Sequence, residues 1–282
     1  MTSRGDLLGV AHNSAGRREA AGVLASMSPS GVGLSLELAL DLVRSRLLSD
    51  AVAEAEQWIE AGGQGVICFA NVHVIEMARR SARLADALSR AELVLADGAP
   101  VAWALGHLCR RPSPRVAGSD FFVALCGRKV GDYRHFLLGS TPQTLLRLDS
   151  AVRHRFPGIL IAGTHSPAFR SWDEDDYAVA VDAVNSAAPD IVWVGMGAPK
   201  QELWMDAMRG RVSAPVLAGV GAVFDFVSGE KRRAPLALQR AGLEWAHRLA
   251  CEPRRLAGRY LRTNTTFLLG VVGAIIRQEL RS

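Results

Sequence analysis

The sequence predicts an α/β protein with a Rossmann-like, mostly parallel sheet covered by helices on both faces, followed by a basic helical C-terminal appendage. Six short apolar runs recur along the chain, and helical patterns separate most of them. Apolar strands that alternate with helices are typical of a parallel sheet buried on both faces. The third observation is a shift to arginine-rich composition near residue 230.

The elements follow one another in a simple order. Residues 1–33 are rich in Gly, Ser, Ala and Arg, which predicts a mobile tail. A helical pattern runs from Leu34 to Ala61 and stops at Gly62-Gly63. The expected strands are residues 65–70, 92–97, 135–140, 159–165, 190–197 and 215–221, with helical patterns over 74–90 and from Thr141 to Arg155.

Residues 34–229 would therefore form the catalytic domain, and residues 230–282 the appendage. Residues 231–262 carry nine Lys and Arg residues against Glu244 and Glu252 only, and residues 267–276 are apolar and uncharged. This run is shorter than the roughly 20 residues that a membrane-spanning helix needs. Burial in the core, packing on a partner and insertion at a membrane surface all remain open.

Composition sets broad limits on function. With 49% hydrophobic and 22% charged residues the chain resembles an ordinary globular protein, and its net charge of +5 favours an acidic partner such as nucleic acid, a phosphate substrate or an anionic membrane. We expect no secretory signal and reduced, cytosolic thiols. The four cysteines form no CxxC pair and show no zinc spacing: Cys68, Cys109, Cys126 and Cys251.

Two polar residues follow the first two expected strands. Ligands of doubly wound sheets bind beyond the carboxyl ends of the strands, so Asn71 and Asp97 are candidates for a site. Asn71 could equally cap the next helix, and Asp97 could form a turn with Gly98. The functional alternative is that Asp97 accepts a proton from an acceptor hydroxyl.

The third strand ends in a glycine turn and a helix start. Gly139 and Ser140 precede Thr141-Pro142, and free N–H groups at such a helix start favour a diphosphate. The signal has low specificity, because many α/β helices begin in this way. After the sixth strand, we expect Asp225 to contact a nucleoside.

The stretch after the fifth strand is the most distinctive. Gly195 and Gly197 would let the backbone approach a ligand, and Pro199 suits the first turn of the following helix. The next three residues would then lie at the N-terminus of that helix. We expect Gln201 to contact the sugar or acceptor, whereas Glu202 is equally suited to stabilising the helix dipole and to catalysis. The first of the three residues is Lys200.

Several familiar signatures are missing from the sequence. Neither Gly-rich stretch completes GxGxxG, and there is no Walker A or GxSxG motif. No DxD-type pair follows a strand, so we expect no metal. Asp173–Asp176 is interpreted as a solvated acidic loop.

Arginines recur at helical spacing in the appendage. Arg248, Arg255, Arg259 and Arg262 are separated by seven, four and three residues, which places them on one face of a helix. Such a face is either solvated or a cationic surface for phosphates. An apolar tail beside it fits attachment to an anionic bilayer.

The sequence contains four characteristic blocks in this order: "ADGAPVAWALGHL…RVAGSDFF", "VGMGAPKQELWM", "GVGAVFDFVSGEKRRAP" and "LEWAHRLACEPRRLAGRYL". Together they resemble the WecG/TagA/CpsF glycosyltransferases, bacterial inverting enzymes that add a sugar to a polyprenyl-diphosphate-linked saccharide. The resemblance covers roughly residues 34–262, and the tail lies outside it.

The resemblance implies a Rossmann-like fold, a UDP-sugar donor and no essential metal. It implies that Asp97 is the general base and that Asn71 and Gln201 belong to the site. It also implies that appendage arginines contribute and that the appendage closes over the site at the membrane. Those arginines would be Arg248, Arg254 or Arg255, and Arg259. One departure is Phe69, where members often have Thr, so any role of that hydroxyl is in doubt.

We therefore expect an inverting glycosyltransferase of bacterial surface polysaccharide synthesis, cytoplasmic and peripheral at the inner face of the plasma membrane. Its oligomeric state stays open, and a homo-oligomer is one option. The sugar and the pathway stay open. The alternative is a basic Rossmann-like protein that binds nucleotide or nucleic acid without sugar transfer; the lack of an RNP pattern disfavours RNA. An NAD-linked oxidoreductase is disfavoured by the incomplete GxGxxG.

Overall fold

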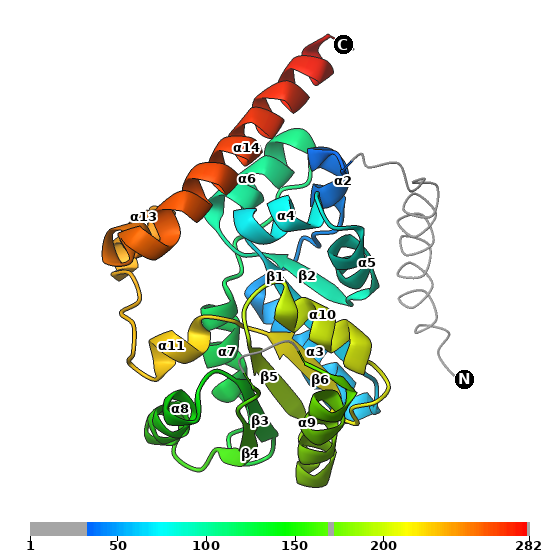
Figure 1. Ribbon diagram of the computed structural model, residues 1–282, viewed down its shortest axis with the longest axis vertical. Coiled ribbons are helices and arrows are strands. Elements are labelled where there is room, and N and C mark those ends of the chain that lie inside the picture. Colours follow the sequence, from blue (N-terminus) through cyan, green and yellow to red (C-terminus); the bar gives the residue numbers. More distant parts are fainter. Residues whose placement is uncertain (1–32, 169–171, 281–282) are drawn as a thin grey trace, which may run out of the picture.

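The computed structural model describes residues 33–168 and 172–280, apart from the side chain of Arg259 (Figure 1). The predicted tail thus lies almost wholly outside the described residues. Six parallel strands form one sheet in the order β2-β1-β6-β5-β3-β4. The predicted fold class is confirmed. The strands are β1 (Gly65–Ala70), β2 (Leu93–Ala96), β3 (Arg134–Gly139), β4 (Leu160–His165), β5 (Ile191–Gly195) and β6 (Val216–Gly219).

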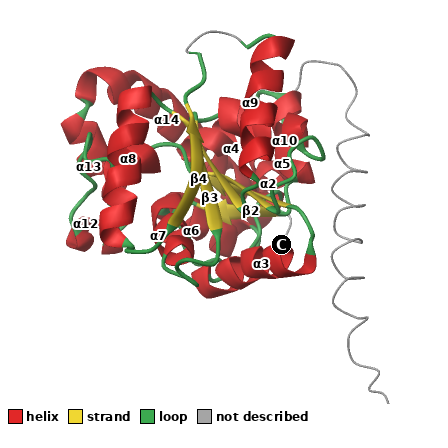
Figure 2. Ribbon diagram, turned by 90° about the horizontal axis from the view of Figure 1, so that it is seen from below, coloured by secondary structure: helices red, strands yellow, loops and turns green. Residues whose placement is uncertain are grey.

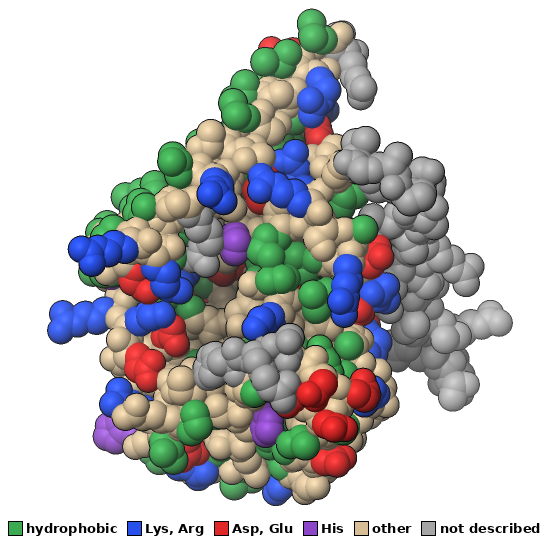
Figure 3. Space-filling model, in the orientation of Figure 1, with side chains coloured by type: hydrophobic (Ala, Val, Ile, Leu, Met, Phe, Trp, Pro, Cys, Tyr) green, Lys and Arg blue, Asp and Glu red, His purple; other side chains and the backbone are tan. Residues whose placement is uncertain are grey.

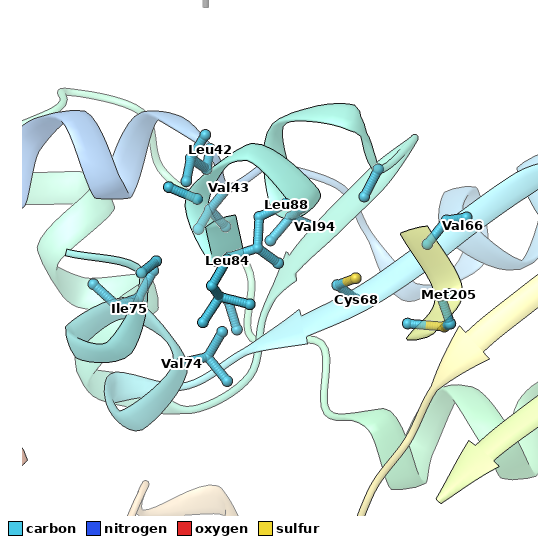
Figure 4. Packing of buried hydrophobic residues seen from close by; sticks show 14 of the residues in the cluster. Leu42, Val43, Val66, Cys68, Val74, Ile75, Leu84, Leu88, Val94 and Met205 are labelled. Atoms are coloured by element: carbon cyan, nitrogen blue, oxygen red, sulfur yellow. The ribbon is translucent and has the colours of Figure 1, made fainter. Parts of the chain in front are cut away.

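Both faces of the central strands are buried. In β1, Cys68 and Ala70 join one apolar cluster, whereas Ile67 and Phe69 join the other, as the two-residue period of a strand requires. The first cluster, part of which is shown in Figure 4, lies under α4 (Val72–Ala78), α5 (Ala82–Arg90), α6 (Ala99–Leu108), α9 (Glu174–Ala187) and α10 (Lys200–Met208). The second lies under α3 (Leu48–Ala61), α7 (Gly118–Cys126), α8 (Pro142–Arg155) and α11 (Val223–Val227) (Figure 2).

The helical pattern predicted from Leu34 to Ala61 is wrong as a single helix. It divides into α2 (Leu36–Asp41) and α3, because the chain between them pairs with the sheet. The Arg44 N–H donates to the carbonyl of Val94 at 2.7 Å. The pattern over 74–90 divides likewise into α4 and α5, where Ser81 caps the second helix.

Asp173–Asp176 is a helix start and not the predicted solvated loop. Asp173 accepts a hydrogen bond from the Asp176 N–H, and the Asp176 carboxylate accepts one from the Asp173 N–H. This reciprocal arrangement is a capping box, which satisfies two N–H groups at the beginning of α9.

The appendage (residues 230–282) contains α12 (Leu236–Arg240), α13 (Glu244–Cys251) and α14 (Pro253–Glu279). The chain breaks between the last two helices at Glu252, since the residue before a proline avoids helical geometry. The predicted single arginine face is therefore wrong: Arg248 lies on α13, whereas Arg255 and Arg262 lie on α14.

The apolar run of the appendage is buried on one side only. Phe267, Val271 and Ala274 enter the first apolar cluster, where α14 contacts α2, α4 and α6. Apolar side chains line the outer edge of α14, and Lys and Arg side chains gather beside its lower end (Figure 3). None of the described helices is both long enough and apolar enough to cross a bilayer. The exposed apolar residues of α14 and its C-cap include Leu261, Leu268, Leu269, Val272, Ile276 and Leu280.

Candidate active site

A cavity of about 760 Å³ opens at the carboxyl ends of the strands. Every strand is followed by a residue that lines it, and the appendage supplies the opposite wall. The residues after the strands include Asn71, Asp97, Ser140, Pro167, Met196 and Val220. The appendage residues include Glu244, Trp245, Arg248, Arg255 and Tyr260.

Most of the residues predicted from the sequence meet at this cavity. Those that line it are Asn71, Asp97, Ser140, Gly195, Gly197, Lys200, Gln201, Asp225, Arg248 and Arg255. Gly139, Glu202 and Arg254 are not among the lining residues, and the side chain of Arg259 lies outside the described part of the structure.

Asp97 lies at the junction of β2 and α6. Its N–H donates to the carbonyl of Ala70 at 3.0 Å, and Gly98 follows with φ at 119°, a conformation suited to glycine. Its carboxylate accepts no hydrogen bond from any described residue. Burial raises the pKa of Asp97 to about 6, and the charge of Glu244 acts in the same direction, while Arg115 and Arg248 oppose it. Within the described part of the chain, Asp97 is thus a cavity carboxylate with a raised pKa and no hydrogen-bond donor.

Asn71 caps α4, as one interpretation of the sequence had it. Its Oδ1 accepts hydrogen bonds from the N–H groups of His73 at 3.0 Å and Val74 at 3.2 Å. Within the described residues, its Nδ2 has no partner. Capping therefore leaves the amide N–H groups of Asn71 to a ligand in the cavity.

The glycines at the ends of β3 and β5 allow the two strands to approach closely. A Cβ on Gly139 would lie 2.6 Å from the carbonyl of Gly195, so Gly139 has a packing role even though it does not line the cavity. Ser140, with φ at 56°, turns the chain toward α8. Thr141 caps that helix by accepting from the Thr144 N–H at 3.0 Å.

Gln201 ties two loops together beneath the cavity. Its Oε1 accepts from the Gly197 N–H at 3.1 Å, and its Nε2 donates to the Gly219 carbonyl and to Glu202 Oε1, both at 2.9 Å. Pro199 is the N-cap of α10, one position before the first turn in which the sequence placed it. The amide of Gln201 thus shapes the floor of the cavity through the backbone.

Glu202 is buried behind this floor. Its Oε2 has no hydrogen-bond partner in the described residues, and burial raises its pKa to about 7, against the opposing effect of the Gln201 hydrogen bond. Glu202 is therefore partly protonated near neutral pH. Its place suits support of Gln201 better than contact with a substrate.

The cations in and beside the cavity differ in whether a carboxylate forms a salt bridge with them. Arg248 lies over the Phe226 ring, 5.5 Å from its centroid, and makes no salt bridge with any described carboxylate. Arg255 is paired with Glu252 at 2.6 Å, and Lys231 pairs with Asp225 at 2.5 Å. Arg248 is thus well placed to bind an anion, since no described carboxylate forms a salt bridge with it.

Sequence reasoning missed an ion-pair ring beside Asp97. We call it the ring: Arg115, Asp120, Arg233 and Glu244. All four residues belong to the ordered blocks that carry the family resemblance, yet none was assigned a role. It also missed the aromatic wall of Trp172, Trp245 and Tyr260. Trp245 and Tyr260 belong to those blocks, whereas Trp172 lies outside them and carried no sequence signal.

A cavity of this size at the carboxyl ends of a parallel sheet is typical of an α/β enzyme that binds its substrates there. Among the described residues, its Asp97 carboxylate accepts no hydrogen bond and its Arg248 forms no salt bridge. The comparison with known proteins narrows this class. The sequence profile described as "Glycosyl transferase WecG/TagA/CpsF family" matches residues 38–281, so the chain belongs to this family of glycosyltransferases.

Two similar proteins are both named N-acetylglucosaminyldiphosphoundecaprenol N-acetyl-β-D-mannosaminyltransferase. The protein of Bacillus spizizenii is 30% identical over 217 residues, which cover 77% of this chain and 82% of the relative. The protein of Staphylococcus aureus is 28% identical over 191 residues, which cover 67% and 73% respectively. The predicted resemblance is confirmed.

Proposed function

We propose that this chain transfers a sugar, with inversion, from a UDP-sugar to a polyprenyl-diphosphate-linked saccharide of bacterial surface polysaccharide synthesis. The observation that carries the proposal is Asp97, whose carboxylate accepts no hydrogen bond from the described residues and shares its cavity with Arg248 and Arg255 of the appendage. The names of the two relatives support an acceptor that bears N-acetylglucosamine on diphosphoundecaprenol.

In the proposed reaction, Asp97 takes the proton from the acceptor hydroxyl as its oxygen attacks the anomeric carbon of the donor. The bond from that carbon to the diphosphate breaks on the opposite side, and UDP leaves with the bonding electrons. Arg248 and Arg255 lie where they can stabilise the charge that develops on the diphosphate. The proposal needs no divalent metal, so EDTA should leave the rate unchanged.

The remaining cavity residues would hold the donor. Asp225 is assigned to the nucleoside, and Ser140, Gly195 and Gly197 to its diphosphate, where small residues let the backbone come close. Lys200 is exposed at the rim and would meet the charged part of either substrate. Asn71 and Gln201 would position the reacting sugars, the first directly and the second through the loops it joins.

The deciding experiment is a donor screen. The purified chain is incubated with one lipid-linked acceptor, N-acetylglucosamine on a polyprenyl diphosphate, and a set of UDP-sugars; products are identified by mass. We expect one donor to give the product, with UDP released only when the acceptor is present. A chain that UDP does not protect against thermal unfolding, and that forms no product with any donor, contradicts the proposal.

The outer face of α14 would rest on an anionic membrane, which would make the enzyme peripheral at the cytoplasmic face. Its apolar side chains and the neighbouring Lys and Arg residues fit such a surface. Leu269→Asp with Val272→Asp should reduce sedimentation with phosphatidylglycerol vesicles about tenfold. The matched control is Leu146→Asp with Val179→Asp, since these residues are equally exposed on other helices. Unchanged sedimentation together with a dimer that the first pair disrupts would point to a second copy as the occupant.

A further inference from the structure

The ring connects the sheet to the appendage beside Asp97. Arg115 and Asp120 belong to the start of α7 and the loop before it, whereas Arg233 and Glu244 belong to the appendage. Glu244 bonds to Arg115 at 3.1 Å and to Arg233 at 3.2 Å; Asp120 bonds to the same two arginines at 3.4 and 2.7 Å. All four side chains are only 19–33% exposed, so solvent screens them less than surface pairs.

We call residues 228–235, which join α11 to α12, the linker. Besides Arg233, the linker contains a second cation, Lys231, that repeats the arrangement. Lys231 contacts Asp225 of α11 at 2.5 Å and Glu252 of the appendage at 3.7 Å. Glu244 is the first residue of α13, and Glu252 is its C-cap. The linker cations Lys231 and Arg233 therefore hold α13 at both ends against carboxylates of the sheet region.

Glu244, on α13, brings a negative charge into the cavity that Asp97 lines. The charged groups that act on Asp97 come from α13 (Glu244 and Arg248) and from the start of α7 (Arg115 and Asp120). Within this set, Glu244 is the only carboxylate that the appendage contributes.

We propose that Glu244 is a positioning residue through which docking of the appendage prepares Asp97 to act as a base. This inference rests on the proposed function of Asp97. Glu244 lines the same cavity as Asp97, and its charge raises the pKa of Asp97 in addition to the effect of burial. A base is most effective when its pKa lies near the operating pH, so undocking should leave Asp97 ionised but weakly basic.

The test uses the full-length chain and the variant Glu244→Gln. We expect the acidic limb of the profile of kcat/KM against pH to move down by at least about half a pH unit, with a roughly two-fold lower rate at neutral pH, because a weaker base accepts the proton less readily. Arg115→Gln should move the limb in the opposite direction, because it removes a cation that lowers the pKa of Asp97. Arg232→Gln is the matched control, since Arg232 is an exposed neighbour of Arg233 outside the ring.

A second readout does not need turnover. The carboxyl ¹³C resonance of Asp97, identified by its loss in Asp97→Asn, is titrated in wild type and in each variant, with thermal unfolding as the check on folding. We expect a lower midpoint in Glu244→Gln and a higher one in Arg115→Gln. A folded Glu244→Gln protein whose limb and midpoint are both unmoved overturns the inference. Full turnover in Asp97→Asn would instead overturn the proposed function, while the titration still decides what Glu244 does.

Discussion

The two walls of the cavity are held in place by different forces. The sheet wall is anchored by apolar burial: all six residues of β1 and all four of β2 are buried. On the opposite wall, α12 and α13 contain no buried residue, and ion pairs from the linker hold α13. Apolar packing is insensitive to salt, whereas partly exposed ion pairs weaken as salt rises. The sheet therefore provides a fixed half of the site, and the appendage an adjustable one.

The largest effect should come from the fixed wall. Asp97→Asn removes the proposed base but keeps the size of the side chain, so turnover should fall by about 10²–10⁴-fold. Protection by UDP against thermal unfolding should persist. In wild type, kcat/KM should decline as the pH falls through about 6, because Asp97 must be ionised to accept a proton. Turnover that survives the substitution would remove Asp97 from the mechanism.

The adjustable wall should contribute next. Arg248→Ala removes the cavity arginine that forms no salt bridge with any described carboxylate, and we expect turnover to fall by about 10²-fold. Arg254→Ala is the control, since Arg254 is not part of the cavity wall. Equal losses in the two variants would mean that net positive charge, rather than the position of Arg248, supports the reaction.

Glu202 tests the buried side of the fixed wall through stability. Its pKa is raised from 4.5 to about 7, so the folded state holds a proton that the unfolded state releases. Stability should therefore fall as the pH rises from about 4.5 to 7. Glu202→Gln should remove this loss, so its Tm should exceed that of wild type by about 2–4 °C at pH 8 and by less at pH 4. The measurement is calorimetry across pH; a difference in Tm that is independent of pH would refute the assignment.

The smallest effect should come from the linker. Lys231→Gln removes one partly exposed contact with Asp225 and one with Glu252, worth roughly 0.2–1 kcal/mol each. We expect turnover to fall only a few-fold and to become less dependent on salt, while Tm changes little. Arg240→Gln, at an exposed position of α12, is the control. A large drop in Tm without any change in the salt dependence would show that Lys231 supports the fold rather than docking.

Local patterns predicted the strands well, because each apolar run has its own length and its own boundaries. They failed where distant partners decide the structure. The break between α2 and α3 follows from pairing of Arg44 with β2, about fifty residues away in sequence. The arginine spacing suggested one helix because the period was counted across Pro253, whose effect on Glu252 outweighs it.

The site was predictable only in part for the same reason. Asn71 and Asp97 could be found because the ends of parallel strands meet at one edge of a sheet. The ring could not, since Arg115 and Glu244 are 129 residues apart and no local period relates them. The hydrogen bond of Gln201 to Gly219 could not be predicted either, because it depends on how the end of β6 lies against α10.

The length of α14 has a consequence for substrate choice. Tyr260 lines the cavity and Ile276 lies on the outer face, and one continuous helix joins them. Sixteen residues at 1.5 Å per residue make a stiff strut of roughly 24 Å. If its outer face rests on the bilayer as proposed, the helix lies along the membrane, and its stiffness fixes the orientation of the cavity relative to the lipid headgroups. The enzyme would then select acceptors by how far their terminal hydroxyl reaches from the membrane surface.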